Sequence, residues 1–197
     1  MEVLLRQNIQ RTIGQQITDD QFEQFSNFLL LRSFDKKTIL CKEGEHCKYV
    51  YFLLKGSAYS FMVNEHGDKH TIQFALEGYW ITDHYSFFSG KPGIYSIETL
   101  EPSQILILDR ENFEKICESN HLFEHFFRIL IQNAFIGLQY RLAKTNSEDA
   151  GHRYAEFSNL HPAFVQRIPQ YLIASYLGIK PQSLSRIRKE QTGKKNT

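Results

Sequence analysis

Glycines at regular intervals in the middle of the chain most strongly limit the folds that this sequence can adopt. They lie 12, 11, 11 and 12 residues apart, at Gly44, Gly56, Gly67, Gly78 and Gly90. Between them are short runs of aromatic and β-branched residues, such as 49–54, 59–63 and 71–75. Glycine suits tight turns because it has no Cβ and adopts positive φ without strain. Short strands separated by turns at this interval predict a β-roll over about Arg32–Asp109.

Helical patterns precede and follow this region. Thr18 and Gln21 form a capping-box pattern, which predicts a helix start within the first thirty residues. A short helix is expected over Asp109–Ser119, and a longer one over about Asn120–Lys144. The longer helix has an apolar stripe at Phe123, Phe126, Phe127, Leu130, Ala134, Leu138 and Leu142. Because it would measure roughly 37 Å, we expect a second copy of the chain to cover the stripe in a homodimer. The alternative is that the stripe packs on the roll.

Charge is distributed unevenly along the chain. Residues 161–197 contain seven Lys or Arg residues and one acid, a net charge of +6, whereas the preceding 160 residues have a net charge of −5. The basic residues are Arg167, Lys180, Arg186, Arg188, Lys189, Lys194 and Lys195. A basic segment attached to an acidic body predicts a polyanionic partner for the C-terminal segment.

The segment Gln170–Lys189 (QYLIASYLGIKPQSLSRIRK) fits the helix-turn-helix pattern. A small residue, Ala174, occupies the fifth position, where the two helices must approach closely, and Gly178 occupies the ninth, in the turn. Pro181 falls in the first turn of the second helix, where its missing N–H costs nothing. Lys180 departs from the pattern, since a Ser or Thr cap is usual there. The five apolar positions are filled by Ile173, Leu177, Ile179, Leu184 and Ile187.

The second helix of this motif has a polar outer face. We predict that the face binds double-stranded DNA, because Gln and Arg suit the base edges of the major groove and Ser, Lys and Arg suit phosphates. The candidate DNA-binding residues are Gln182, Ser183, Arg186, Arg188 and Lys189.

The stretch from Tyr154 to Lys189 resembles the C-terminal end of Crp/Fnr transcription regulators, particularly in its LGI-x-P-x-S-LSRIR sequence. The resemblance implies an α+β chain with a β-roll like that of cyclic nucleotide-binding proteins. It also implies a winged-helix-like C-terminal domain, although only eight residues follow Lys189, too few for a wing. The expected domains are a sensor at 1–119, a dimerisation helix at 120–146 and a DNA-binding domain at 147–197. The partners implied are DNA, a second copy of the chain, RNA polymerase and an unknown small-molecule effector.

Nucleotide-binding members of this family have a Gly-Glu pair and, some ten residues later, an arginine for the cyclic phosphate. Thr82 and Asp83 occupy the places of the pair, and no arginine lies between Lys69 and Arg110. Because a buried phosphate without a charge partner is unfavourable, we expect neither cAMP nor cGMP to bind. The candidate ligand-binding residues are Thr82, Asp83, Trp80 and Tyr85, the two aromatic residues being either pocket or core.

Other functional classes fit the sequence less well. Three cysteines, two of them in a C-x5-C spacing, do not supply an iron–sulfur cluster, and the eight histidines include no H-x-H pair for a cupin-like metalloenzyme. We therefore expect no catalytic activity, no metal and no cofactor. The alternative function is a regulatory module that senses a small ligand without sequence-specific DNA binding. No apolar run of membrane-spanning length is present, and the expected location is the cytoplasm.

Overall fold

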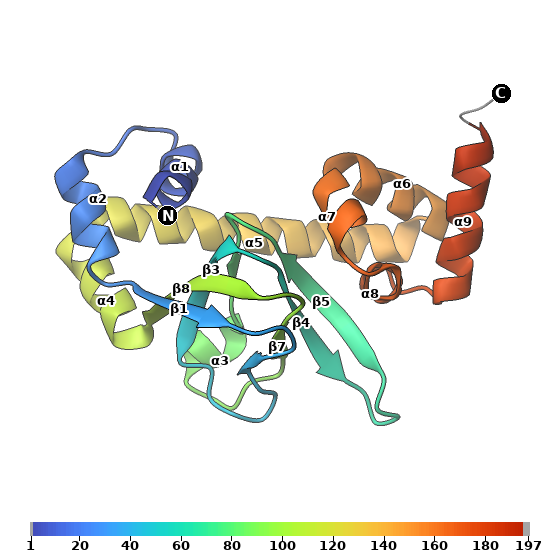
Figure 1. Ribbon diagram of the computed structural model, residues 1–197, viewed down its shortest axis with the longest axis horizontal. Coiled ribbons are helices and arrows are strands. Elements are labelled where there is room, and N and C mark those ends of the chain that lie inside the picture. The colour runs from blue at the N-terminus through green and yellow to red at the C-terminus, as the bar shows by residue number, and fades with distance from the viewer. Residues whose placement is uncertain (1, 195–197) are drawn as a thin grey trace. The chain divides into compact units, whose positions relative to one another are not determined.

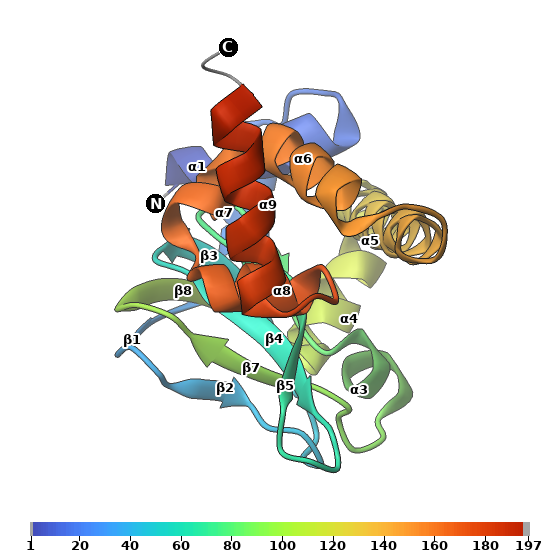
Figure 2. The same ribbon diagram turned by 90° about the vertical axis from the view of Figure 1, so that its right-hand side faces the viewer.

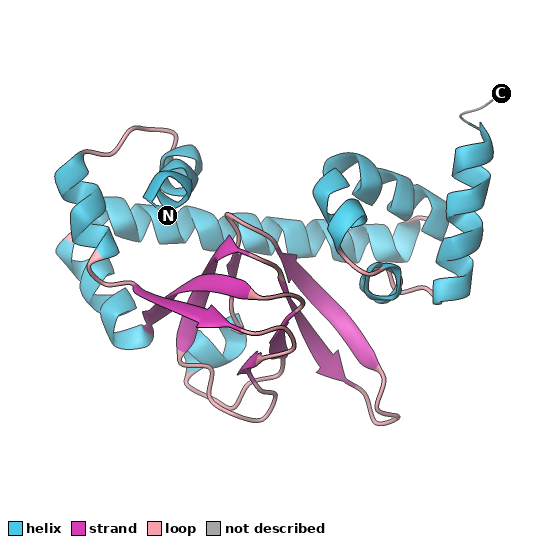
Figure 3. Ribbon diagram, viewed as in Figure 1, coloured by secondary structure: helices cyan, strands magenta, loops and turns pink. Residues whose placement is uncertain are grey.

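The computed structural model describes residues 2–194, which fall into two compact units. Unit 1 contains the residues up to Met62 together with Gln73–Phe135, and unit 2 contains Val63–Ile72 together with the residues from Ile136 onward. Figure 1 follows the chain in order, and Figure 3 separates its helices from its strands. Lys195, counted above in the basic segment, lies outside the described residues.

Two four-stranded antiparallel sheets form the predicted β-roll. One has the strand order β1-β8-β3-β6 and the other the order β2-β7-β4-β5. The first sheet is held by pairs such as Tyr51 with Ile107, and the second by pairs such as Ser60 with Ile97. The strands are β1 (Leu30–Phe34), β2 (Ile39–Cys41), β3 (Tyr49–Lys55), β4 (Ala58–Val63), β5 (Lys69–Ala75), β6 (Trp80–Ile81), β7 (Ser96–Thr99) and β8 (Ser103–Asp109).

Four of the regularly spaced glycines lie in turns between strands of the roll, as predicted, and the fifth, Gly90, is the C-cap of α3. All five have positive φ, between 68° and 97°. At Gly56 a side chain is also excluded by space, because a Cβ would lie 2.3 Å from Oγ of Ser103. Inside the roll a compact apolar cluster includes Tyr51, Leu53 and Ile105.

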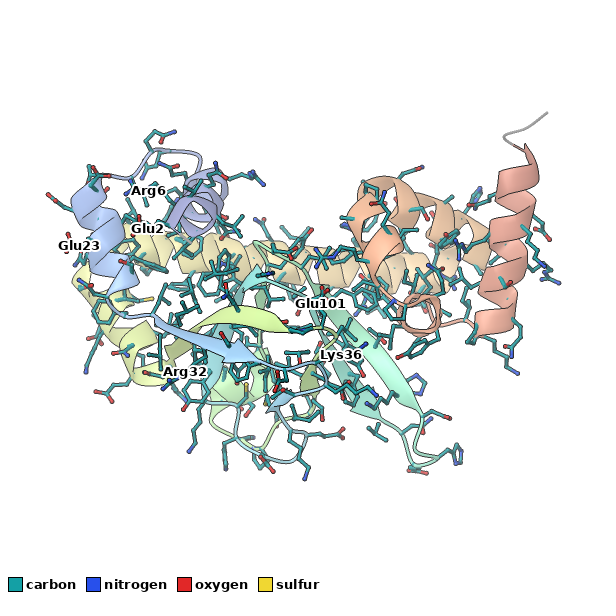
Figure 4. The ribbon with its side chains drawn as sticks, viewed as in Figure 1. Glu2, Arg6, Glu23, Arg32, Lys36 and Glu101 are labelled. Atoms are coloured by element: carbon teal, nitrogen blue, oxygen red, sulfur yellow. The ribbon has the colours of Figure 1, made fainter. Side chains whose placement is uncertain are left out.

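Four helices of unit 1 share an apolar core with β3 and β8: α1 (Glu2–Ile13), α2 (Asp19–Ser26), α3 (His84–Ser89) and α4 (Arg110–Ser119). The capping box at Thr18 is present, since Thr18 Oγ1 accepts from the Gln21 N–H and Gln21 Oε1 accepts from the Thr18 N–H. Arg6, labelled on α1 in Figure 4, donates to the Ile17 carbonyl and pairs with Asp19 at 2.8 Å. These contacts fix α1 to the segment that leads into α2.

The long helix predicted over Asn120–Lys144 is α5 (His121–Ser147). Its apolar stripe is covered in the first half only. Phe123, Phe126 and Phe127 are at most 3% exposed and join the core between the helices and the roll. Leu138 and Leu142 are 50% and 59% exposed. Packing on the chain's own roll therefore accounts for the beginning of the stripe and not for its end.

Unit 2 continues with four shorter helices: α6 (Ala150–Leu160), α7 (Pro162–Arg167), α8 (Gln170–Tyr176) and α9 (Pro181–Lys194). Their core contains Tyr154, Phe157, Phe164, Ile173 and Leu184, each at most 6% exposed. Figure 2 looks onto α9 with α8 at its lower end. No helix within residues 2–194 combines the length and the apolar character needed to cross a bilayer.

Candidate functional site

The loop that follows β6 carries two of the candidate ligand-binding residues, and both are buried. Thr82 Oγ1 donates to the Tyr49 carbonyl at 2.8 Å, which ties the loop to β3. Asp83 is the N-cap of α3, and its Oδ1 accepts from the Ser86 N–H at 3.1 Å. Thr82 is 4% exposed and Asp83 is wholly buried.

The second carboxylate oxygen of Asp83 is also satisfied. Asp83 Oδ2 accepts from the N–H groups of Ile94 and Tyr95, at 2.7 Å and 3.0 Å. Gly93 passes so close that a Cβ there would lie 2.9 Å from Oδ2 and 3.1 Å from the Glu45 carbonyl oxygen. The backbone N–H groups of the loop from Asp83 to Tyr95 therefore bind the carboxylate of Asp83, which begins the loop.

Two thiols lie beside this loop. The Cys47 N–H donates to Ser86 Oγ at 2.8 Å, and Cys47 Sγ lies 3.5 Å from Thr82 Oγ1. A hydrogen bond from Cys41 lowers the pKa of Cys47, assisted by the Thr82 hydroxyl and the Asp83 N–H, while burial opposes the shift. The same hydrogen bond, together with burial, raises the pKa of Cys41. Both cysteines are buried, and neither forms a disulfide.

The two candidate aromatic residues differ in their surroundings. Trp80 is 8% exposed, and its Nε1–H donates to Asn8 Oδ1 at 2.9 Å. Its ring contacts the ring of Phe52, with 4.8 Å between centroids. Tyr85, on α3, is 45% exposed. The structure thus places Thr82, Asp83 and Trp80 within unit 1's interior and Tyr85 on its surface.

The two helices predicted for Gln170–Lys189 are present as α8 and α9, joined by a turn in which Gly178 has φ +69°. Ala174 is wholly buried, as a close approach of two helices requires. Ile173, Leu177 and Leu184 are buried, while Ile179 and Ile187 are half-buried.

The candidate DNA-binding residues lie on α9. Gln182, Arg186, Arg188 and Lys189 are exposed and Ser183 is half-buried. Arg186 Nε lies 3.8 Å from Oε1 of Glu190, an exposed ion pair that holds the guanidinium only weakly.

Unit 2 also contains contacts that the sequence did not predict. Ser175 Oγ on α8 accepts from the Thr71 N–H at 2.9 Å and donates to the Lys69 carbonyl at 3.0 Å. Arg141 on α5 donates to the Ile72 carbonyl at 2.7 Å, and its guanidinium lies 4.6 Å from the ring centroid of Tyr176. Most of these partners are far apart in sequence, and no local pattern marks them.

Comparison with known families identifies the first unit's roll. Residues 31–120 match the family model of the cyclic nucleotide-binding domain. The roll is therefore similar to cyclic nucleotide-binding domains. No curated protein matches the sequence significantly.

Several solved structures are similar in fold over most of the chain. FixK2 from Bradyrhizobium japonicum is 17% identical with a TM-score of 0.72, over 84% of this chain and 85% of that one. The catabolite activator protein of Thermus thermophilus is 16% identical with a TM-score of 0.60, over 93% and 87%. A chain from Eubacterium rectale described as a Crp/Fnr-family regulator is 15% identical with a TM-score of 0.67, over 90% and 85%. The expected fold, a β-roll with a long helix and C-terminal helices, is confirmed.

Proposed function

We propose that this protein is a DNA-binding transcription regulator of the Crp/Fnr type and that α9 contacts the major groove. The observation that carries the proposal is the two-sided character of α9. Leu184 is 1% exposed on its inner side, whereas Gln182, Arg186 and Lys189 are exposed to solvent. A helix fixed by apolar contacts on one side and bearing amide and cationic groups on the other suits groove binding.

Local charge supports the same assignment. The segment 161–197 has a net charge of +6 in a chain whose total is +1. Positive charge attracts DNA through phosphate contacts and counterion release, independently of base sequence. Glutamine and arginine on the same surface would supply the selection among sequences. RNA polymerase would be a further partner, with the protein acting in the cytoplasm.

We further propose that the active form is a homodimer joined through the second half of α5. Its exposed apolar residues are Phe135, Ile136, Leu138, Tyr140 and Leu142, each at least 49% exposed. Phe135, Leu138 and Leu142 fall on one side of the helix, and exposed apolar side chains grouped in this way mark an interaction site. A two-fold dimer would place its DNA-contacting helices about 34 Å apart. The operator would then be a near-palindrome with half-sites one helical turn apart.

The proposed regulator does not respond to cAMP or cGMP. Some ten residues after Asp83, where the family's nucleotide binders have an arginine, this chain has Gly93. The N–H groups of Ile94 and Tyr95 are already engaged by the Asp83 carboxylate. A phosphate entering this loop would meet a buried negative charge in place of a cation, which is strongly unfavourable.

Selection of bound fragments from genomic DNA, followed by gel-shift titration, tests the proposal. Arg186→Ala should weaken specific binding by about 1–3 kcal/mol and relax the preference at one base pair of each half-site. Lys189→Ala should weaken binding evenly across sequences and reduce the salt slope by about one. Lys36→Ala, at the exposed lysine between β1 and β2 labelled in Figure 4, is the matched control and should change neither.

Two outcomes would contradict the proposal. If Arg186→Ala binds DNA as tightly and as selectively as the parent, the assignment of α9 to the major groove is wrong. Absence of any sequence preference in the parent would favour the alternative, a ligand-sensing module that does not bind DNA specifically. A calorimetric dissociation constant below about 10 µM for cAMP or cGMP would separately overturn the proposed lack of response to these nucleotides.

A further inference from the structure

A cavity of about 460 Å³ lies in unit 1, between α1, the segment that forms β6, α3 and the first half of α5. Its size is within the range of small-molecule sites in proteins. None of its lining residues belongs to β4 or β7, and Asp83 and Gly93 are not among them. Two residues of the loop between Asp83 and Tyr95, His84 and Phe88, line the cavity, whereas the buried Asp83 and Gly93 do not.

Aromatic side chains form much of the cavity wall. The Trp80 and Phe127 rings meet edge to face with 5.9 Å between centroids, and Phe113 lies 4.7 Å from Phe127. Leu130 and Ile131 continue this wall along α5. Aromatic walls of this kind suit an aromatic or other apolar body.

The polar residues of the wall include one cation without a partner. Arg11 on α1 is exposed, and within residues 2–194 its guanidinium has no ion pair or hydrogen bond. Gln7, also on α1, and Asn133 on α5 likewise have side-chain amides with no partner in the described part of the chain. By contrast, the carboxylate of Glu77 accepts from the Gly56 N–H at 2.9 Å. The wall thus contains one carboxylate that is already hydrogen-bonded, and a cation and two amides without partners in the described residues; these unpartnered groups suit an anion.

A further polar group, His84, adds no competing positive charge. Surrounding protein lowers the pKa of His84 by desolvating the imidazolium, although the nearby Asp83 charge opposes the shift. Its ring stacks on Phe88, with 6.1 Å between centroids and 24° between planes. Neutral His84 therefore extends the aromatic wall and leaves Arg11 as the cation at this site.

Hydrogen bonds hold the cavity wall in place. Asn8, which also lines the cavity, donates from Nδ2 to the Gly78 carbonyl at 2.9 Å and accepts from Trp80 Nε1–H. Together with the contacts of Arg6, these bonds anchor α1 against the roll. A wall fixed before binding reduces the entropy cost of taking up a ligand.

We propose that this cavity binds a small amphipathic anion, with an aromatic body against Trp80 and Phe127 and its acidic group at Arg11. This assignment concerns unit 1 alone, so it does not depend on DNA binding by α9. It also differs from a cyclic nucleotide site, since Asp83 and Gly93, which occupy the places of the family's glutamate and arginine, do not line the cavity.

The test compares two fluorescent probes that share one ring system, with the full-length protein. The anionic probe is 8-anilinonaphthalene-1-sulfonate, and the neutral probe is N-phenyl-1-naphthylamine, which lacks the sulfonate. Both should bind the parent saturably. Arg11→Gln should lower the affinity for the anionic probe by about tenfold, which is the effect of one charge-assisted hydrogen bond. It should lower the affinity for the neutral probe by less than about twofold. Arg128→Gln, at a half-exposed arginine of α5 that does not line the cavity, should change neither.

Filling the cavity distinguishes this site from other apolar surfaces. Gln7→Trp and Ala134→Trp place a large ring at exposed lining positions on α1 and α5. Each should lower the affinity for both probes by at least about tenfold. Val3→Trp and Ala143→Trp, at exposed positions on the same helices outside the cavity, should leave both affinities unchanged. Affinities unaffected by either filling variant would overturn the proposal, as would equal losses for both probes in Arg11→Gln or no saturable binding by the parent.

Discussion

The carboxylate of Asp83 accepts a hydrogen bond from the backbone N–H of Ile94, with 2.7 Å between donor and acceptor. The bond joins the start of α3 to the segment that enters β7, eleven residues later. The Gly93 N–H donates to the Glu45 carbonyl at 2.8 Å, which fixes the same loop from its other side. A buried carboxylate thus organises the loop that leads from α3 to β7.

Asp83→Asn should destabilise the protein by about 2–3 kcal/mol. Asp83 is wholly buried and accepts three backbone N–H bonds, from Ser86, Ile94 and Tyr95. An amide has one acceptor oxygen, so its NH₂ group would face at least one of these donors without a hydrogen bond. Urea denaturation measures the change in the free energy of unfolding.

Asp149→Asn is the matched control for this prediction. Asp149 caps α6 by accepting from the His152 N–H, but it is exposed to solvent. Because asparagine caps helices about as well as aspartate does, this change should cost less than about 0.5 kcal/mol. Equal losses in the free energy of unfolding for Asp83→Asn and Asp149→Asn would show that the buried hydrogen bonds of Asp83 contribute no more than an exposed helix cap.

Gly178→Ala and Gly137→Ala should change stability in opposite directions. Gly178 has φ +69° in the turn between α8 and α9, and a Cβ there costs about 1 kcal/mol because of the backbone conformation. Gly137 lies inside α5, where an added Cβ would meet no neighbouring side chain or strand within 4 Å. Alanine there should therefore stabilise the helix by about 0.5–1 kcal/mol. Losses of similar size at both positions, measured by urea denaturation, would contradict this reasoning.

Leu138→Asp should convert the proposed dimer into a monomer. Leu138 is 50% exposed on α5, so an aspartate there is solvated in the single chain but would be buried without a partner in a dimer. Sedimentation equilibrium at micromolar concentration measures the mass. Gln15→Asp introduces the same charge at an exposed polar position outside α5 and should leave the mass at two chains. A parent that sediments as one chain would overturn the dimer proposal.

Local sequence patterns predicted most of the elements of this fold. The Thr18 capping box, the corner glycines and the Ala174–Gly178 spacing each reflect a requirement of the backbone or of close packing within a few residues. For the same reason α3 and β6 were missed, since six and two residues are too few to show a period.

The candidate ligand sites were less predictable because they depend on distant partners. The cavity brings Arg11 of α1 beside Trp80 and α5, and no sequence pattern relates these three segments. Likewise, one apolar stripe on α5 contains both buried Phe126 and exposed Leu138, and periodicity alone does not show where the roll ends. Asp83 was predicted as a candidate ligand residue from its position, whereas its three backbone donors come from the folded loop.

His161 should make the free energy of unfolding fall as the pH decreases through about 6.5. Its ring lies 5.4 Å from the Phe157 and Phe164 rings, and burial lowers its pKa in the folded state. The unfolded chain therefore takes up a proton at a higher pH than the folded chain, so this stability is present above the unfolded pKa and is lost below it.

His161→Phe keeps an aromatic ring in the cluster and removes the titration, and it should flatten the dependence between about pH 7.5 and about pH 5. His84, whose pKa is also lowered by burial, would account for part of the slope that remains. Urea denaturation across this range measures the slope, and comparison of the two proteins at about pH 8, where the imidazole is neutral, isolates any change in packing. An unchanged slope in His161→Phe would show that this imidazole is protonated equally readily in the folded and unfolded chains.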